Sequence, residues 1–423
     1  MSGDLLKEVT IPIFSGFIGY ATNWTGVWML FNPLEFKGFR LPGLRPFAHV
    51  LPRRIQQIPG VMQGGVGWQG IIPSRAAKMG SIAVDKGIAK VGSPAEFYAQ
   101  IDPERIAEQI LLTSRSDMRE LIDRIMEREH PELWNELPPR VREAVHERVQ
   151  EQLPDIVREV TERIGDNIDD LLDVKLMVIR HIEAHPELAN RIFLDVGKKE
   201  LDFIVRFGGV FGFVCGFPLI LLTNAFPYWW VLPILGTIVG YVTNWLAIWM
   251  IFEPNDPRRV WRWTAQGLFL KRQREVAQVY ATIIADDIVT VRNIGSELLH
   301  GPRADRTRAM IQNALRPAVD RATGAVQPLV RMAVGPREYD AIRDSLAAEG
   351  VEYTITPLQD ERFNREQAQS IRELIGERIR EMSSRDFAEL LRSGMREDEW
   401  LLVLHGAVLG FGAGLVHLAI FGV

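Results

Sequence analysis

The sequence has almost no cysteine and long stretches without charge. Cys215 is the only cysteine among 423 residues, which excludes an intramolecular disulfide. No Asp, Glu, Lys or Arg occurs in three windows of 26, 46 and 24 residues, from Val9 to Leu34, from Phe207 to Phe252 and from Trp400 to Val423. The averages of 24% charged residues and a mean hydropathy of −0.01 therefore combine two kinds of segment, which are apolar windows and unusually charged stretches between them.

The motifs that mark common enzyme sites are also missing. The sequence has no Gly-x-Ser-x-Gly motif, no phosphate-binding loop with Gly-Lys-Ser/Thr and no His-Glu-x-x-His. Residues 65–70 match a dinucleotide-binding glycine pattern, but they follow a Pro- and Gly-rich stretch rather than a strand. His181 and His185 have zinc-ligand spacing without a third ligand at metal spacing. We therefore expect no enzyme, with no catalytic residue, no metal site and no cofactor.

The uncharged windows are long enough to cross a membrane. About 20 apolar residues span a hydrocarbon core of roughly 30 Å. The first and third windows each supply one span, and the second supplies two, joined by a turn at Pro227 with Trp229 and Trp230 as interfacial aromatics. The alternative for each window is a helix buried in a globular core. Acidic residues before the first window argue against a cleaved signal peptide. The predicted spans are about 9–31, 207–225, 228–252 and 400–422.

The segments between the spans carry most of the basic residues near the apolar windows. Lys and Arg concentrate on the cytoplasmic side of membranes, a rule that weakens for segments longer than about 60 residues. We therefore expect residues 35–206 and 253–399 in the cytoplasm and both termini outside. Acidic residues outnumber basic ones, 54 to 49, and the basic residues form no stripe, so nucleic acid is not an expected partner.

Parts of the sequence occur twice in the same order. Residues 19–33 align without gaps on residues 240–254 with nine of fifteen positions identical, and Gln69–Arg75 then matches Gln266–Arg272. Glycine rows in the second and fourth predicted spans also correspond, at Gly208, Gly212 and Gly216 and at Gly406, Gly410 and Gly414. We infer two parallel tandem repeats, residues 1–226 and 227–423, each with a span, a helical cytoplasmic segment and a second span.

These repeated residues resemble a known bacterial family. The doubled Gly-Tyr-x-Thr-Asn-Trp element at 19–24 and 240–245, the Phe-x-Pro that follows and the later Gln-Gly with a basic residue are similar to the family called domain of unknown function 445. The resemblance covers essentially the whole chain, although the second half has a shorter stretch between its Asn and its Gln-Gly. It implies an integral membrane protein of bacteria with no assigned reaction, which we place in the inner membrane.

The repeated polar and glycine residues are candidate positions inside the membrane. Asn23 and Asn244 lie eight residues before the ends of their spans, which places them about 12 Å inside the hydrocarbon boundary at roughly 1.5 Å per residue. With Thr22 and Thr243 they either hold helices together or line a cavity for a substrate or a lipid headgroup. The glycine rows repeat every four residues and predict close helix packing.

A second set of candidates flanks the spans. Aromatic, amide and basic side chains of this kind anchor to lipid headgroups, and they are Trp68, Gln69, Arg75, Trp261, Trp263, Gln266 and Arg272.

The charged segments predict amphipathic helices. An apolar stripe runs from Val141 to Leu171, with Pro154 predicted to kink it or to begin a second helix. Ser93 and Asp102, each followed by Pro, predict helix starts. Residues 351–356 give the one clear strand signal, expected to pair with residues 40–52 or with another subunit.

The sequence thus predicts an all-α membrane protein with four transmembrane helices in two parallel tandem repeats, long amphipathic cytoplasmic helices and at most a minor β element. We expect a non-enzymatic homo-oligomer that organises the envelope or handles lipid at the membrane surface, with membrane lipids as partners. The alternative is an oligomeric transporter or channel that uses the Thr-Asn pairs of the two repeats.

Overall fold

A computed structural model describes residues 3–40, 52, 56, 58–62, 64–82, 84–85, 92–260, 263–323, 327–354, 356–393 and 395–421. The chain divides into two compact units. The span unit comprises residues 1–87, 179–280 and 378–423, and the polar unit comprises residues 88–178 and 281–377. Each unit takes residues from both predicted repeats. The repeat limits at 226 and 227, which come from sequence similarity rather than from contacts, stay a prediction.

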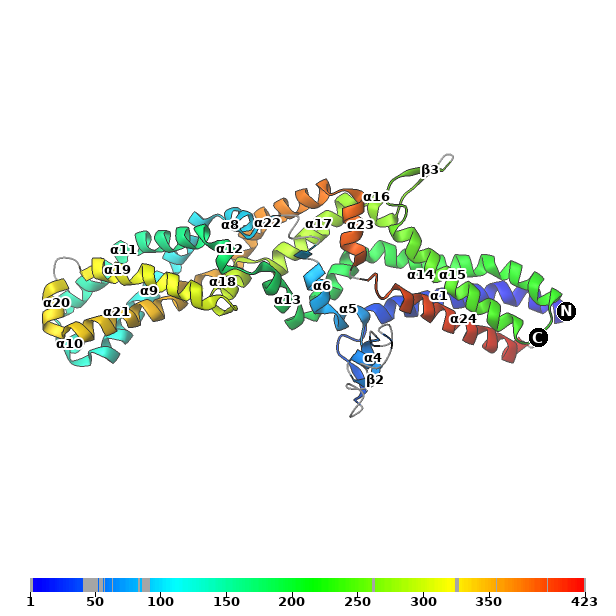
Figure 1. The fold of residues 1–423 in the computed structure, drawn as a ribbon, viewed down its shortest axis with the longest axis horizontal. Coiled ribbons are helices and arrows are strands. Elements are labelled where there is room, and N and C mark those ends of the chain that lie inside the picture. Colours follow the sequence, from blue (N-terminus) through cyan, green and yellow to red (C-terminus); the bar gives the residue numbers. More distant parts are fainter. Residues whose placement is uncertain are drawn as a thin grey trace. The chain divides into compact units, whose positions relative to one another are not determined.

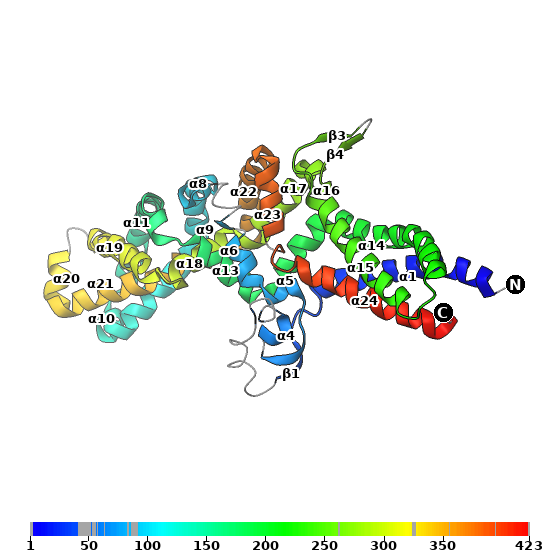
Figure 2. The same cartoon turned by 45° about the vertical axis from the view of Figure 1, so that its right-hand side comes forward.

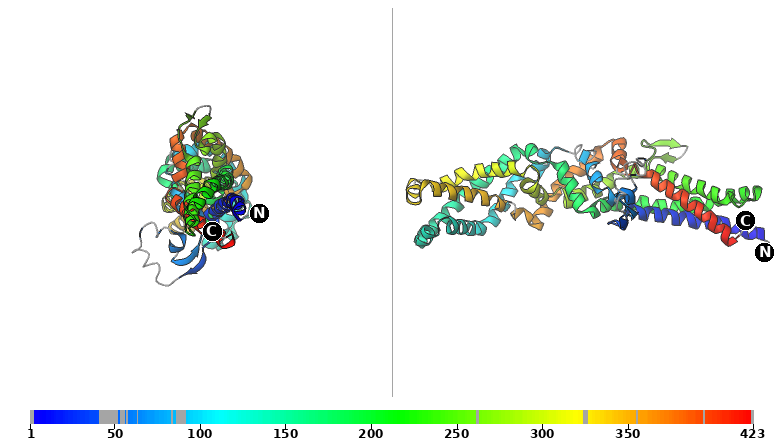
Figure 3. Two further views of the ribbon diagram at one scale, coloured as in Figure 1. Left: turned by 90° about the vertical axis from the view of Figure 1, so that its right-hand side faces the viewer. Right: turned by 60° about the horizontal axis from the view of Figure 1, so that its bottom comes forward.

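Four long helices form a bundle in the span unit, where they run side by side (Figures 1 and 3). Helix α1 packs along α14, α15 packs along α24, and contacts of α14 with α15 and of α1 with α24 close the bundle. The bundle helices are α1 (Gly3–Phe31), α14 (Pro186–Ala225), α15 (Val231–Phe252) and α24 (Glu399–Phe421).

Three of these helices, α14, α15 and α24, are long and apolar enough to cross a membrane. They occupy the windows predicted for the last three spans. Helix α1 covers the first predicted span and ends at Phe31, as expected, but its sequence mixes Gly, Ser, Thr and Asn with the apolar residues. The membrane class and the helical fold are confirmed, and the count of four spans stays a prediction.

The outside of the bundle is apolar. Phe17, Val210 and Leu221 are 66%, 67% and 73% exposed. A continuous surface of such side chains is unfavourable in water, and it matches a hydrocarbon environment. Both Thr-Asn pairs, by contrast, are buried inside the bundle, with Asn23 and Thr243 only 2% and 3% exposed.

Short antiparallel strand pairs follow α1 and α15 (Figure 2). Strand β1 (Lys37–Arg40) pairs with β2 (Gly65–Trp68), and β3 (Arg258–Val260) pairs with β4 (Trp263–Ala265). They make up the minor β element, although the sequence did not predict these positions. The other helices of this unit are α4 (Pro59–Met62), α5 (Ile71–Ser74), α6 (Ala76–Ile82), α16 (Leu268–Lys271), α17 (Gln273–Ile283) and α23 (Ser384–Ser393). Helix α17 ends in the polar unit, and α22 (Glu361–Glu381) begins in the polar unit and ends in this one.

The polar unit is a bundle of amphipathic helices. Its long members pack in pairs, α9 with α11, α11 with α19, and α19 with α21. Its elements are α8 (Pro94–Gln100), α9 (Pro103–Glu129), α10 (Pro131–Glu136), α11 (Pro139–Asp166), α12 (Ile168–Leu171), α13 (Val174–Ala184, which ends in the span unit), the π-helix η2 (Ile284–Ile288), α18 (Val291–His300), α19 (Ala304–Thr323), α20 (Gln327–Val334), α21 (Pro336–Gly350) and the 3₁₀ helices η4 (Glu352–Thr354) and η5 (Thr356–Gln359).

The predicted helix starts are confirmed by capping contacts. The Ser93 side chain accepts a hydrogen bond from the Glu96 backbone N–H in a capping box, and Asp102 accepts one from the Arg105 N–H. Helix α11 runs through Pro154 without a break, so the prediction that a second helix begins there is wrong.

The predicted strand at residues 351–356 is also wrong. The segment forms η4 and η5 instead, with Ile355 outside the described residues. Val351 keeps a helical backbone conformation after α21 and is fully buried against Leu299 and Ile311. Burial in the helical core therefore outweighs the β propensity of the sequence. Of the suggested pairing region, β1 pairs with β2, and residues 41–51 lie outside the described residues.

Candidate functional sites

The two amides at aligned positions of the sequence, Asn23 and Asn244, each donate a hydrogen bond to a backbone carbonyl of the adjacent helix. Asn23 Nδ2 donates to the Ile204 carbonyl at 2.6 Å, and Asn244 Nδ2 donates to the Leu402 carbonyl at 2.7 Å. Each carbonyl lies four residues before the first glycine of a predicted row. Aligned positions of the sequence therefore make the same contact, and each amide fixes the position of one bundle helix on its neighbour.

Glycines allow this close approach. A Cβ atom at Gly208 would overlap the Asn23 amide and the Gly19 carbonyl. The remaining glycines of both rows also face a neighbouring helix, where an added Cβ would meet backbone atoms: Gly212 faces Ser15, Gly216 faces Pro12, Gly406 faces Gly240, Gly410 faces Gly236 and Gly414 faces Pro233. The helices thus approach each other at backbone distance along the rows.

The two Thr-Asn pairs line one small cavity inside the bundle, called here the intramembrane chamber. Its volume is about 60 Å³. A water molecule needs roughly 10–15 Å³ of such space, so the chamber has room for a few waters. Asn23 Oδ1 is buried and accepts no hydrogen bond within the described part of the chain. The polar residues that line the chamber are Ser15, Thr22, Asn23, Thr243, Asn244 and His417.

Two buried ion pairs lie next to the bundle. Arg75 Nη2 is 2.6 Å from Asp398 Oδ1, and the two side chains are 5% and 1% exposed. Arg272 Nη1 is 2.6 Å from Glu200 Oε1, with exposures of 22% and 3%. Both acids lie eight residues before the first glycine of a row, and each pairs with the Arg of the other predicted repeat. These acids were not among the predicted site residues, although their equal offset from the glycine rows is a usable signal.

Acids in and beside these pairs have shifted pKa values. Burial raises the pKa of Asp398 to about 6, and the neighbouring Arg75 charge opposes this rise. Hydrogen bonds from Arg272 and Lys199 lower the pKa of Glu275, which flanks the second pair, to about 2.

The other predicted interfacial residues hold the chain after each helix against the helix end. Trp68 Nε1 donates to the Met29 carbonyl at 3.3 Å. Gln69 Nε2 donates to the Leu34 carbonyl at 2.7 Å, and Gln266 Nε2 donates to the Asn255 carbonyl at 3.4 Å. Gln69 and Arg75 are only 9% and 6% exposed, which leaves little surface for a headgroup. Trp261 and the side chain of Trp263 lie outside the described residues.

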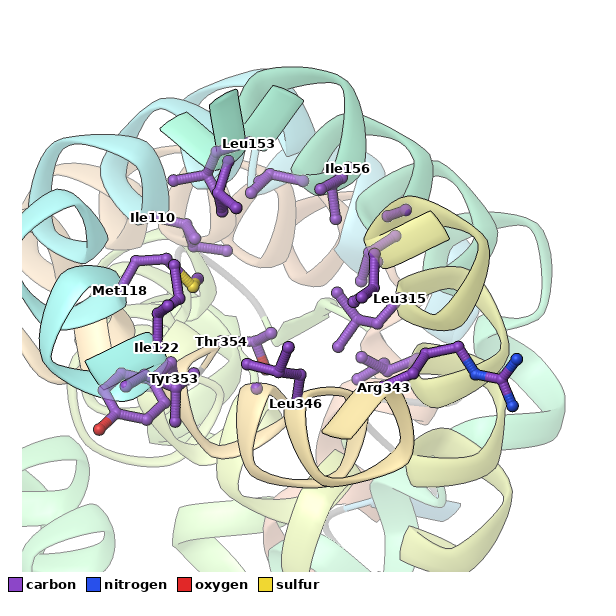
Figure 4. Close-up of a pocket in the computed structure, with 18 of the residues that line it drawn as sticks. Ile110, Met118, Ile122, Leu153, Ile156, Leu315, Arg343, Leu346, Tyr353 and Thr354 are labelled. Atoms are coloured by element: carbon purple, nitrogen blue, oxygen red, sulfur yellow. The ribbon is translucent and has the colours of Figure 1, made fainter. Parts of the chain in front are cut away.

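A much larger cavity lies inside the polar unit (Figure 4). Its volume is about 820 Å³, within the range of about 300–1,000 Å³ typical of small-molecule sites. Helices α9, α11, α18, α19 and α21 and the η4–η5 segment line it. The apolar stripes predicted helix packing, but not that the packed helices leave this space. Apolar side chains around it include Ile110, Met118, Ile122, Leu153, Ile156, Leu315 and Leu346.

Few polar groups reach the cavity. The Tyr98 hydroxyl donates to the Thr161 carbonyl at 3.0 Å. Arg343 lines the cavity with its carbon chain while its guanidinium points away, 3.3 Å from Asp340 (Figure 4). The Thr307 hydroxyl is fully buried and has no hydrogen-bond partner among the described residues. The lining therefore favours an apolar occupant over a polar one.

Comparisons with known proteins give local matches to membrane proteins. The chain is 35% identical over 69 residues to a UPF0754 membrane protein of Shouchella clausii, 34% over 103 residues to one of Synechococcus sp. and 32% over 91 residues to one of Staphylococcus epidermidis. The matches cover 16%, 23% and 21% of this chain and 18%, 25% and 23% of those proteins, so the chain spans at most a quarter of the curated relatives it matches.

No family model matches the chain, and no solved structure matches it. The resemblance to domain of unknown function 445 stays a prediction, since the relatives carry a different family name. The matches and the three apolar helices together show a membrane protein that is locally similar to UPF0754 membrane proteins.

Proposed function

We propose that this protein is a non-enzymatic membrane protein that binds lipid in the cavity of its polar unit and so handles lipid at the membrane surface. The cavity carries the proposal. An apolar molecule that fills a space of about 820 Å³ gains dispersion contacts with the side chains around it. Lipid is the apolar molecule to which a chain with membrane-spanning helices has ready access.

The membrane architecture is part of the same proposal. We infer four spans in two parallel repeats, with α1 as the first span, and the polar segments in the cytoplasm of a bacterial cell. The identical contacts of Asn23 and Asn244 and the crossed pairs of Arg75 and Arg272 support the duplication. Helix α1 joins the spans because its partners α14 and α24 are apolar enough to cross the membrane. Homo-oligomerisation remains a proposal from the sequence.

Lipid binding is tested by comparing two Trp substitutions on the same helix. Met118 on α9 lines the cavity, whereas Leu112 on α9 is 76% exposed. We expect lipid to co-purify with the wild-type chain in detergent, to fall severalfold in Met118→Trp, which fills the cavity, and to be unchanged in Leu112→Trp. Mass spectrometry of extracted lipid measures the amount of lipid per protein chain, and thermal unfolding checks that both variants fold. Equal lipid in the wild type and Met118→Trp would contradict the proposal.

The intramembrane chamber favours a second candidate function, an oligomeric transporter or channel. It collects the Thr-Asn pairs of both repeats around one space. Its volume of about 60 Å³ admits only a few waters, so a larger solute requires another conformation. If the amides line a pathway, Asn23→Leu with Asn244→Leu abolishes solute flux in proteoliposomes while the bundle still assembles. Loss of assembly in this double variant assigns the amides to helix packing instead.

A further inference from the structure

We propose that the cavity of the polar unit is a slot with one open end that takes a single unbranched acyl chain, tail first. This inference rests on the proposed lipid binding and adds the shape, number and direction of the chain. A fatty acid is the simplest molecule of this class. The argument uses the length of the cavity, the exposure of its two ends and the distribution of its polar groups.

The cavity is long and narrow. Its lining residues on α11 extend from Val141 to Ile164, and those on α9 extend from Ile106 to Met126. At roughly 1.5 Å per residue these stretches are about 35 Å and 30 Å of helix. A volume of about 820 Å³ spread along such a length leaves a slender space. A flexible linear chain suits this shape better than a broad fused-ring molecule or a lipid with two chains side by side.

The two ends of the slot differ in exposure. At the start of α11, Val141 and Val145 line the cavity yet are 43% and 36% exposed, so this end meets solvent. At the other end Val160 packs with Leu299, which is 2% exposed, and the nearby Thr307 is 0% exposed. The slot is therefore open beside Val141 and closed beside Leu299.

The two ends of the slot also differ in the charge of their lining residues. Arg148 lines the open end with a side chain that is 55% exposed, and it forms an exposed pair with Glu151 at 3.5 Å. The residues that line the closed end carry no charge in the described part of the chain. A carboxylate or other polar head would lose its water at the closed end without compensation, and it keeps that water at the open end. The tail accordingly points toward Leu299.

The direction makes Leu299 a determinant of chain length. Saturated fatty acids of 10 to 20 carbons compete with a fluorescent fatty acid for the full chain, purified and held in amphipol without detergent. In Leu299→Phe, which shortens the closed end, we expect the tightest-binding fatty acid to be at least two carbons shorter than in the wild type. Val145→Phe adds a ring at the open end, and we expect it to weaken all lengths alike with no change in the preferred length.

A second substitution at Leu299 distinguishes an effect on chain length from simple misfolding. Leu299→Ala lengthens the closed end and should move the preference to longer chains, the opposite direction to Leu299→Phe. If Val145→Phe changes the preferred chain length and the Leu299 variants do not, the proposed direction of the tail is wrong. If the wild type binds all chain lengths with equal affinity, the cavity is not a slot with a closed end. If fatty acids do not bind but two-chain phospholipid co-purifies and is lost in Met118→Trp, lipid binding stands and this inference fails. If no lipid binds in either assay, both fail.

Discussion

Gly406 shows how strongly single residues limit the packing of the bundle. Its Cα faces the Asn244 amide and the Gly240 carbonyl at a distance that leaves no space for a Cβ atom. The same amide donates its hydrogen bond to Leu402, one turn earlier on α24. Close backbone approach and the buried amide hydrogen bond therefore depend on each other, because a wider helix separation would break the bond.

Substitution of Gly406 by Ala should destabilise the protein by about 1–3 kcal/mol, since the added methyl forces α24 away from α15. Gly412→Ala is the matched control on the same helix, because nothing lies within 4 Å of a Cβ atom there. Thermal unfolding in detergent should show a lower midpoint for the first variant and little change for the second. Equal midpoints would show that α15 and α24 are not packed as described.

At the scale of elements, buried ion pairs hold short helices against the long ones. The pair of Arg272 and Glu200 joins the start of α17 to α14, and the pair of Arg75 and Asp398 joins the segment between α5 and α6 to the start of α24. A buried pair adds little net stability, but loss of one partner leaves an uncompensated charge. Its main effect is therefore to specify which elements meet.

Arg272→Met should destabilise the protein by about 3–5 kcal/mol, because Glu200 is then buried without a counter-charge. The double variant Arg272→Met with Glu200→Met should recover most of this loss. Arg362→Met is the control, since its pair with Glu366 is exposed at 85% and 51% and contributes at most about 1 kcal/mol. Denaturant unfolding of the wild type, Arg272→Met, Glu200→Met and the double variant measures the coupling, and additive effects of the two buried substitutions would contradict it.

At the scale of the whole molecule, the apolar surface of the span unit and the charged surface of the polar unit require different solvents. Leu221 on α14 is 73% exposed, and mean hydropathy near zero for the whole chain averages over both surfaces. A membrane satisfies the first surface, and the cytoplasm is the proposed environment of the second.

Single cysteines test this orientation once Cys215 is replaced by Ala. The single-cysteine variants His130→Cys and Met310→Cys, both in the polar unit, should resist an impermeant thiol reagent in intact bacteria and react after permeabilisation. Tyr228→Cys lies in the turn between α14 and α15, where Tyr228 is 57% exposed, and it should react in intact cells. Labelling of position 130 or 310 without permeabilisation would place the polar unit outside.

The sequence by itself determined where the apolar helices lie. The predicted spans at 228–252 and 400–422 correspond to α15 at Val231–Phe252 and α24 at Glu399–Phe421. The cost of moving a charge into an apolar environment is a property of each residue and its neighbours along the chain, so uncharged windows locate such helices directly. Capping residues such as Ser93 act locally in the same way.

Tertiary structure decided the features that join residues distant in sequence. It turned the predicted strand at 351–356 into short helices, paired Arg75 with Asp398, and brought Thr22 and Thr243 to one chamber. It also left the 820 Å³ cavity, which depends on how fully several helices fill the space between them. An apolar stripe indicates which face of a helix is buried. The volume left between such faces is set only by their mutual packing, because it depends on side chains from every helix at once.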